Sequence, residues 1–280
     1  MVFGTDLTGK MAVITGAGGV LCSMFARILA KAGASVALLD INLEAARLVA
    51  EEICSEGGEA LAYEVDVMDK EFLERVHARV LAELGPCDIL INGAGGNQAC
   101  ANTSKESFEM GDIEADVVSF FDLEYKGIQS VLDLNFLGSF LTSQVFAKDM
   151  VGREGCSILN ISSASAVRPL TRIPVYSGAV AALSNFTKWL AVHFAKAGIR
   201  VNAIAPGFFV TNQNEGLLYE EENIPSTRAA NVLSATPMAR FGRPEELTGA
   251  LLFLLNKEAS SFITGIILPV DGGFTAAAGV

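Results

Sequence analysis

Short apolar runs alternate with longer amphipathic stretches along most of this 280-residue sequence. The runs have the length of buried strands, and the stretches between them repeat apolar residues with the period of a helix. Strands and helices in alternation predict a parallel sheet with right-handed crossovers and helices on both faces. We therefore expect an α/β chain that forms one doubly wound domain over residues 1–280.

The expected strands are residues 11–15, 35–39, 60–65, 88–92, 157–162, 200–204 and 266–270. The expected helices are residues 21–32, 43–56, 70–84, 176–197, 244–255 and a segment that ends near Met150. Gly33, Gly57 and Gly198 stand where glycines end helices, and Pro244 stands where a proline begins one. These signals predict a sheet of about seven parallel strands.

Two stretches interrupt this alternation. Residues 97–129 form a long acidic insertion after the fourth expected strand, and residues 207–242 form a long loop after the sixth. Both follow the carboxyl ends of strands, where open α/β sheets bind ligands. Loops of this length are typically lids or binding loops, so we expect the second to be a substrate loop and the first to border the same site.

Composition excludes several classes of function. The 20 basic and 32 acidic residues give a net charge of −12, which is unsuited to binding nucleic acid. The five cysteines are scattered without a C-x-x-C spacing, which predicts neither disulfides nor a metal site. The sequence shows no signal peptide and no apolar stretch as long as a membrane span. We expect a cytoplasmic protein that acts on a small molecule, without a membrane partner.

A glycine cluster directly follows the first expected strand and opens the first expected helix. Gly16, Gly18 and Gly19 allow the backbone to approach a pyrophosphate closely and to present N–H groups to it. Asp40 ends the second expected strand, where a carboxylate accepts from both ribose hydroxyls and repels a 2′-phosphate. This pattern predicts a dinucleotide site that prefers NAD(H) over NADP(H). Asp40 alternatively caps the next helix, and Asp66 either reaches the adenine or caps a helix.

Further motifs follow in a characteristic order. They are Asn92-Gly93-Ala94-Gly95, Asn135, Ser162-Ser163, Tyr176, Pro206-Gly207 with Thr211, and Val270-Asp271-Gly272-Gly273. With the glycine-rich turn, these motifs resemble the short-chain dehydrogenase/reductase family over nearly the whole chain, which implies a Rossmann fold. The segments Gly19-Val20-Leu21-Cys22 and Pro206-Gly207-Phe208-Phe209-Val210-Thr211, together with the insertion, resemble the branch of D-mannonate oxidoreductases, or fructuronate reductases.

The resemblance implies the binding residues. Those for the cofactor are Gly16, Gly18, Gly19, Val20, Leu21, Asp40, Asp66, Val67, Asn92, Ala94, Gly95, Pro206, Gly207, Phe209 and Thr211. Those for the substrate, a sugar acid or polyol, are Asn97, Arg172 and Phe208, and the resemblance also implies a homotetramer. Val20 and Cys22 stand where the family commonly has glycines, and we expect their side chains to narrow the approach of the pyrophosphate.

Moving a hydride to or from a carbinol carbon requires a proton to move on the oxygen. The resemblance implies that Tyr176 transfers this proton and that Ser163 holds the substrate oxygen by a hydrogen bond. It also implies that Asn135 anchors a water in the proton path. Ser163 is alternatively a capping hydroxyl. The family's lysine, four residues after the tyrosine, is replaced by Val180. An unassisted phenol titrates near ~10, so we expect proton abstraction at neutral pH to be severely slowed.

The two arginines that precede Tyr176, Arg168 and Arg172, are better placed than Lys188 to bring a positive charge to the pocket. Arg172 is expected to pair bidentately with a substrate carboxylate, although a surface role is equally open for both arginines. The leading hypothesis is an NAD(H)-dependent oxidoreductase of D-fructuronate and D-mannonate, or of another secondary alcohol. The alternatives are a dinucleotide-binding protein without turnover and an active enzyme in which Val180 is an isolated substitution.

Overall fold

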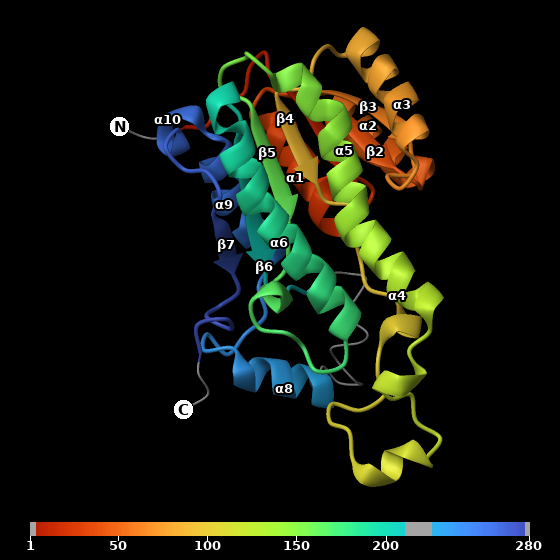
Figure 1. Cartoon of the computed structure of the whole chain (residues 1–280). Helices are drawn as coiled ribbons and strands as arrows, with labels where there is room; N and C mark the ends of the chain where they lie inside the picture. The colour runs from red at the N-terminus through yellow and green to blue at the C-terminus, as the bar shows by residue number, and fades with distance from the viewer. Residues whose placement is uncertain (1–3, 211–225, 278–280) are drawn as a thin grey trace.

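The protein is described by a computed structural model over residues 4–210 and 226–277. This described part contains a seven-stranded parallel sheet in the order β3-β2-β1-β4-β5-β6-β7 (Figure 1). The strands are β1 (Met11–Thr15), β2 (Ser35–Asp40), β3 (Glu59–Glu64), β4 (Ile89–Asn92), β5 (Ser157–Ile161), β6 (Arg200–Pro206) and β7 (Ile267–Val270). The predicted doubly wound α/β fold is confirmed.

Helices cover both faces of this sheet. They are α1 (Val20–Lys31), α2 (Leu43–Ser55), α3 (Lys70–Glu83), α4 (Tyr125–Leu132), α5 (Gly138–Phe146), α6 (Pro174–Phe194), α8 (Thr227–Ala235), α9 (Thr248–Leu255) and α10 (Lys257–Ser260). One core packs α1, α2 and α9 against the sheet, and a second core packs α3, α5 and α6 against its other face. Burial on both faces explains why the strands are continuous apolar runs.

Short helical turns complete the described part. The 3-10 turns are Ala99–Ala101, Met110–Ile113, Phe120–Asp122, Ala147–Met150, Ala164–Ala166, Ala195–Ala197 and Pro244–Leu247. A π-helical turn, Asp133–Leu137, joins α4 to α5. Single π turns inside helices are frequent at functional sites, and this one carries Asn135.

The order of the strands places the ligand site. The chain builds outward from β1 to β3, then returns and adds β4 on the opposite side of β1. Such a reversal opens a crevice at the carboxyl ends of the strands. In Figure 1 the insertion (residues 97–129) and α8 both lie beyond this carboxyl edge of the sheet.

Local signals predicted the helix ends well. Gly33, Gly57 and Gly198 all have positive φ angles, of 99°, 86° and 78°, in the left-handed region that favours glycine after a helix. Pro244 begins the 3-10 turn that leads into α9, as expected, whereas α6 begins at Pro174, two residues before the expected start. The sequence interpretation missed α8, which lies within the expected loop 207–242.

Across residues 4–210 and 226–277, no helix has both the length and the apolar character needed to cross a membrane. The five cysteines are all free thiols, and the described residues contain no cluster of metal-binding side chains.

Candidate active site

A cavity of about 620 Å³ lies at the carboxyl ends of the strands around β1 and β4. Its lining includes ten of the predicted cofactor residues: Gly16, Gly18, Gly19, Val20, Leu21, Asp40, Asp66, Val67, Ala94 and Gly95. This volume lies within the usual range for a ligand or cofactor site. The glycine turn, the end of β2 and the end of β4 therefore meet in one place, as the motif order predicts.

The glycine turn shapes this cavity through its backbone. Gly16 has a φ of 66°, and a Cβ atom there would lie 2.9 Å from the Cα of Ala94. Gly19 is the N-cap of α1, and the described residues supply neither a side-chain cap nor an acidic group to the first turn. The N–H groups and the positive end of the helix dipole are thus available to an anion, so the turn fits a pyrophosphate.

Asp40 is held at the edge of the cavity by two backbone donors. Its Oδ2 accepts from the N–H of Gly18 at 2.8 Å, and its Oδ1 accepts from the N–H of Asn42 at 2.8 Å. Asn42, rather than Asp40, is the N-cap of α2. The alternative interpretation of Asp40 as a helix cap is therefore wrong, and its carboxylate lies at the edge of the cavity beside the glycine turn.

Two other predicted cofactor residues have different surroundings. Asp66 lines the cavity and accepts from the N–H of Met68 at 2.9 Å, while Asp69 is the cap of α3. Asn92 is buried, and its Nδ2 donates to Ser143 Oγ at 2.9 Å and to Asn160 Oδ1 at 2.8 Å. Its side chain thus braces β4 against β5 and α5 and does not line the cavity, and its contact with the cofactor stays a prediction.

Cys22 departs from the family pattern and packs beside β4 at the wall of the cavity. Its side chain is buried, and a Cβ added to Gly93 would lie 2.2 Å from its Sγ, so the thiol fills the space beside β4. Burial, and to a lesser extent the charge of Asp40, raise the pKa of this thiol to about 12. Cys22 is therefore an unreactive packing group. Val20 and Cys22 both stand in the first turn of α1 and both line the cavity.

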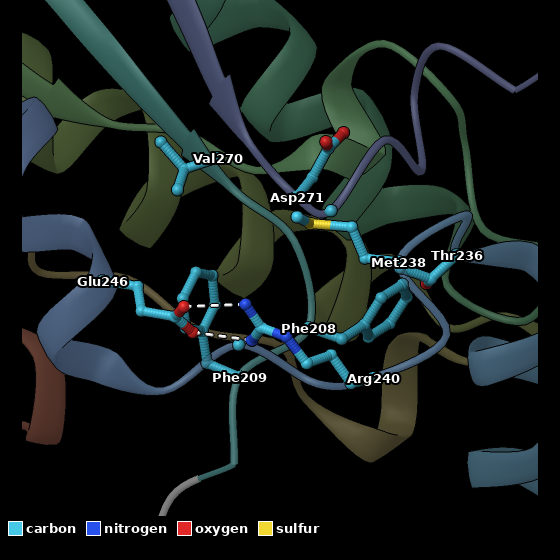
Figure 2. A pocket seen from close by; sticks show the side chains of 10 residues that line it. Phe208, Phe209, Thr236, Met238, Arg240, Glu246, Val270 and Asp271 are labelled. Atoms are coloured by element: carbon cyan, nitrogen blue, oxygen red, sulfur yellow. Dashed lines mark hydrogen bonds and ion pairs between the residues drawn. The ribbon is translucent and has the colours of Figure 1, made fainter.

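The segment after β6 borders a second cavity, of about 240 Å³. Figure 2 shows Phe208 and Phe209 beside the Arg240–Glu246 ion pair, which is joined by two hydrogen bonds of 2.8 Å. The Arg240 guanidinium lowers the pKa of Glu246 to about 2. The guanidinium of Arg240 and the carboxylate of Glu246 thus already bond to each other.

Pro206 and Gly207 also lie away from the main cavity. Pro206 ends β6, and a Cβ on Gly207 would lie 2.7 Å from the Cα of Asp271 after β7. These two residues and Phe209 do not line the 620 Å³ cavity, and their contact with the cofactor stays a prediction. Thr211 lies outside the described residues.

Tyr176 and Ser163 lie together on facing elements. Tyr176 is in the first turn of α6, and Ser163 precedes the 3-10 turn that follows β5. Burial raises the pKa of the Tyr176 phenol, and a hydrogen bond with the Ser163 side chain lowers it in part. Ser163 Oγ also accepts from the N–H of Ser165 at 3.2 Å, so Ser163 is a capping residue, and its role toward the substrate oxygen stays a prediction.

Val180 lies one helical turn after Tyr176 and is 2% exposed. Its carbonyl accepts a hydrogen bond of 3.3 Å from Ser162 Oγ, and Ser162 Oγ also pairs with Ser184 Oγ at 2.7 Å. Ser162 therefore has a structural role, since its hydroxyl ties the end of β5 to α6. Within the described residues, no cation contributes to the pKa of Tyr176, so an apolar side chain occupies the position from which a lysine would act.

The side chain of Asn135 fastens the end of β4. Its Nδ2 donates to the carbonyls of Gly96 and Val131, both at 2.8 Å, and its Oδ1 accepts from the N–H of Gly96 at 2.9 Å. A Cβ on Gly95 would lie 2.7 Å from this Oδ1. The Asn135 amide thus shapes the loop after β4, and its link to a water in the proton path stays a prediction.

Arg168 does not reach the pocket as proposed. Its Nη1 donates to the carbonyl oxygens of Phe274 at 3.0 Å and Ala277 at 3.4 Å, and its guanidinium lies 4.7 Å from the centre of the Phe274 ring. Arg172 is exposed, and its Nε donates to the carbonyl of Thr103 at 3.2 Å. Arg168 thus holds the C-terminal segment, and Arg172 contacts the insertion.

Several residues at the site were not predicted. Ile41 is 68% exposed, and it lines the main cavity together with Leu134 and Ile161. An isoleucine directly after Asp40, at the end of an expected strand, was an available signal for an apolar surface beside this carboxylate. Thr103 carried no signal, because its role depends on a backbone contact with Arg172 that arises from tertiary structure.

An open parallel sheet with an anion-binding helix start and a neighbouring tyrosine–serine pair defines a dinucleotide-dependent oxidoreductase site. The family model described as enoyl-(acyl carrier protein) reductase matches residues 19–275. The chain belongs to the short-chain dehydrogenase/reductase family, whose members are oxidoreductases.

Close relatives agree with this assignment. An uncharacterised oxidoreductase of Haemophilus influenzae is 55% identical over 275 residues, covering 98% of this chain and 96% of that protein. The uncharacterised oxidoreductase UxuB of Bacillus subtilis is 48% identical and covers 98% of both. A Haemophilus crystal structure with bound NAD, provisionally named a D-mannonate oxidoreductase, is 55% identical with a TM-score of 0.95 and 98% coverage of both chains.

Proposed function

We propose that the chain is an NAD(H)-dependent oxidoreductase of a sugar acid or polyol, with D-fructuronate and D-mannonate as the leading pair. The observation that carries the proposal is the 620 Å³ cavity with Asp40 fixed at its edge. A carboxylate there favours ribose hydroxyls and opposes the 2′-phosphate of NADP(H). The Haemophilus structure with bound NAD supports the same cofactor, and its provisional name supports the substrate pair.

The protein residues have separate tasks in the proposed reaction. The bound nicotinamide supplies a hydride to the carbonyl carbon in reduction and accepts one from the carbinol carbon in oxidation. Tyr176 donates its phenolic proton to the carbonyl oxygen in reduction, and Ser163 donates a hydrogen bond to the same oxygen. Asn135 keeps the end of β4 in place beside them.

Substrate recognition is proposed for the two long loops. The insertion contributes Asn97, which is exposed and bonded through Nδ2 to Asn102 Oδ1 at 2.9 Å. The segment after β6 contributes Phe208, and the loop before α6 contributes Arg172. The Nη groups of Arg172 are the proposed partners of the substrate carboxylate, because a guanidinium binds a carboxylate in a bidentate manner.

A second candidate function is dinucleotide binding without appreciable turnover. Val180 favours it, because the burial that raises the pKa of Tyr176 is opposed by no cation in the described residues. The phenol then stays protonated near neutral pH, which blocks proton abstraction from an alcohol and weakens acid catalysis in reduction.

We further propose that the protein is a cytoplasmic homotetramer, because the family that it resembles implies this assembly.

NADH binding and turnover are best measured on the same preparation. We expect NADH fluorescence to show binding, and NADH oxidation to be faster with D-fructuronate than with a neutral ketose such as D-fructose. Binding without oxidation of NADH by any ketose would support the second function. Failure to bind NADH would refute both proposals.

A further inference from the structure

The segment 96–103 connects the main cavity to the start of α6, and each of its ends is hydrogen-bonded to a site element. At the first end, Asn135 holds the backbone of Gly96 through two hydrogen bonds of 2.8 and 2.9 Å. At the second end, the N–H of Thr103 donates to the carbonyl of Arg172 at 3.0 Å, and Arg172 Nε donates back to the carbonyl of Thr103 at 3.2 Å. Thr103 and Arg172 are thus joined in both directions.

At the second end, a cavity lies between the side chains of the insertion and those of the loop before α6. This cavity has a volume of about 220 Å³, with Phe108 and Asp112 on one side and Thr171 and Pro174 on the other. Among the described residues, the two Thr103–Arg172 bonds are the hydrogen bonds that cross from residues 97–122 to residues 167–173. The position of the insertion at this end therefore depends on this pair of bonds.

We propose that Arg172 is a positioning residue that fixes the insertion against the start of α6 through its Nε and its backbone carbonyl, independently of any charge it offers to a ligand. Arg172 lies two residues before Pro174, where α6 begins, and four before Tyr176. Holding Thr103 there fixes the substrate side of the site relative to the phenol. The proposal has two arms. The structural arm is the position of the insertion, and it rests on the structure alone. The substrate arm is the effect of Arg172 on ligand binding, and it rests on the proposed function.

Three substitutions separate the Nε donor from the charge. Arg172→Gln places an amide nitrogen the same number of bonds from the backbone as Nε, so it keeps the donor and removes the charge. Arg172→Met keeps a side chain of similar length and removes both. Arg172→Lys keeps the charge and moves the donor outward.

Amide hydrogen exchange tests the structural arm without requiring activity. We expect the amide of Thr103 to exchange roughly fivefold faster in Arg172→Met, the factor that one net hydrogen bond contributes, and at nearly the original rate in Arg172→Gln. The amides of Gly96, held by Asn135, and of Ser104, bonded to the carbonyl of Val118 at 2.8 Å, are internal controls that should not change. Equal exchange at Thr103 in the original chain and in Arg172→Met would overturn the proposal.

Ligand binding to the NAD⁺ complex tests the substrate arm, because oxidised cofactor with a ketose cannot turn over. We expect Arg172→Met to bind D-fructose about fivefold more weakly than Arg172→Gln, because both lack the charge and only the glutamine keeps the donor. A loss shared by Arg172→Gln and Arg172→Met, with Arg172→Lys unaffected, would show that charge alone matters and would overturn positioning. Failure of NAD⁺ to bind would refute the proposed function while leaving the exchange result to decide the role of Arg172.

Discussion

The cofactor end and the acid–base end of this site depart from the family pattern in different ways. At the cofactor end, Cys22 stands where the family commonly has a glycine; its thiol packs beside Gly93, and the cavity that it helps to line is about 620 Å³. At the acid–base end, Val180 replaces a lysine, and it too packs well, at 2% exposure. The comparison teaches that a substitution is tolerated where only the shape of the site matters and the new side chain packs well. Where the reaction needs a positive charge, good packing of an apolar side chain does not replace that charge.

The largest expected effect comes from Val180→Lys. A cation one turn from Tyr176 would stabilise the phenolate, so we expect the rate of NADH-dependent reduction of D-fructuronate to rise at least ~100-fold, the low end of a positioned acid–base contribution. Val180→Met, of similar length and uncharged, is the control and should leave the rate unchanged. Steady-state kinetics would contradict the comparison if both variants matched the original chain.

The next largest effect is expected at Gly16. Its φ of 66° and the 2.9 Å approach to Ala94 Cα mean that Gly16→Ala must distort the turn, so we expect NADH to bind at least ~10-fold more weakly. Gly178→Ala is the control, because a Cβ there meets nothing within 4 Å and the position is inside α6. We expect this control to raise stability by about 0.5–1 kcal/mol with unchanged affinity, as measured by denaturation and fluorescence titration.

Asp40→Ala should change which cofactor is preferred. Loss of the charged acceptor is expected to weaken NADH binding about tenfold and to strengthen NADPH binding, because the repulsion of the 2′-phosphate is removed. Paired dissociation constants for the two cofactors give the ratio directly. An unchanged ratio would show that Asp40 serves the turn through Gly18 and does not select the cofactor.

The smallest effect is expected for Arg168→Ala. It removes the guanidinium from the Phe274 ring and from two carbonyls, so we expect a loss of about 1–2 kcal/mol of unfolding free energy. The KM for D-fructuronate should not change. A large rise in KM would restore Arg168 as a substrate-binding residue.

Local signals predicted most of the fold because they depend on neighbours in sequence. The apolar run 11–15 coincides with β1, and Gly33 ends α1 as expected. The site was less predictable where partners are distant: Arg168 bonds to a carbonyl 106 residues away, and Thr103 meets Arg172 across 69 residues. Asn92 carried the right motif but uses its side chain inside the core, which no spacing reveals.

The pH dependence of oxidation by the unmodified chain tests the central claim most directly. Burial raises the pKa of Tyr176 above its ordinary value of 10.0, and the Ser163 hydrogen bond offsets this in part. Because oxidation needs the phenolate, we predict that the rate of NAD⁺ reduction with D-mannonate rises about tenfold per pH unit from about 7 to 9.5, without a plateau. A plateau below about pH 8 would show that another group stabilises the phenolate, and would contradict the account.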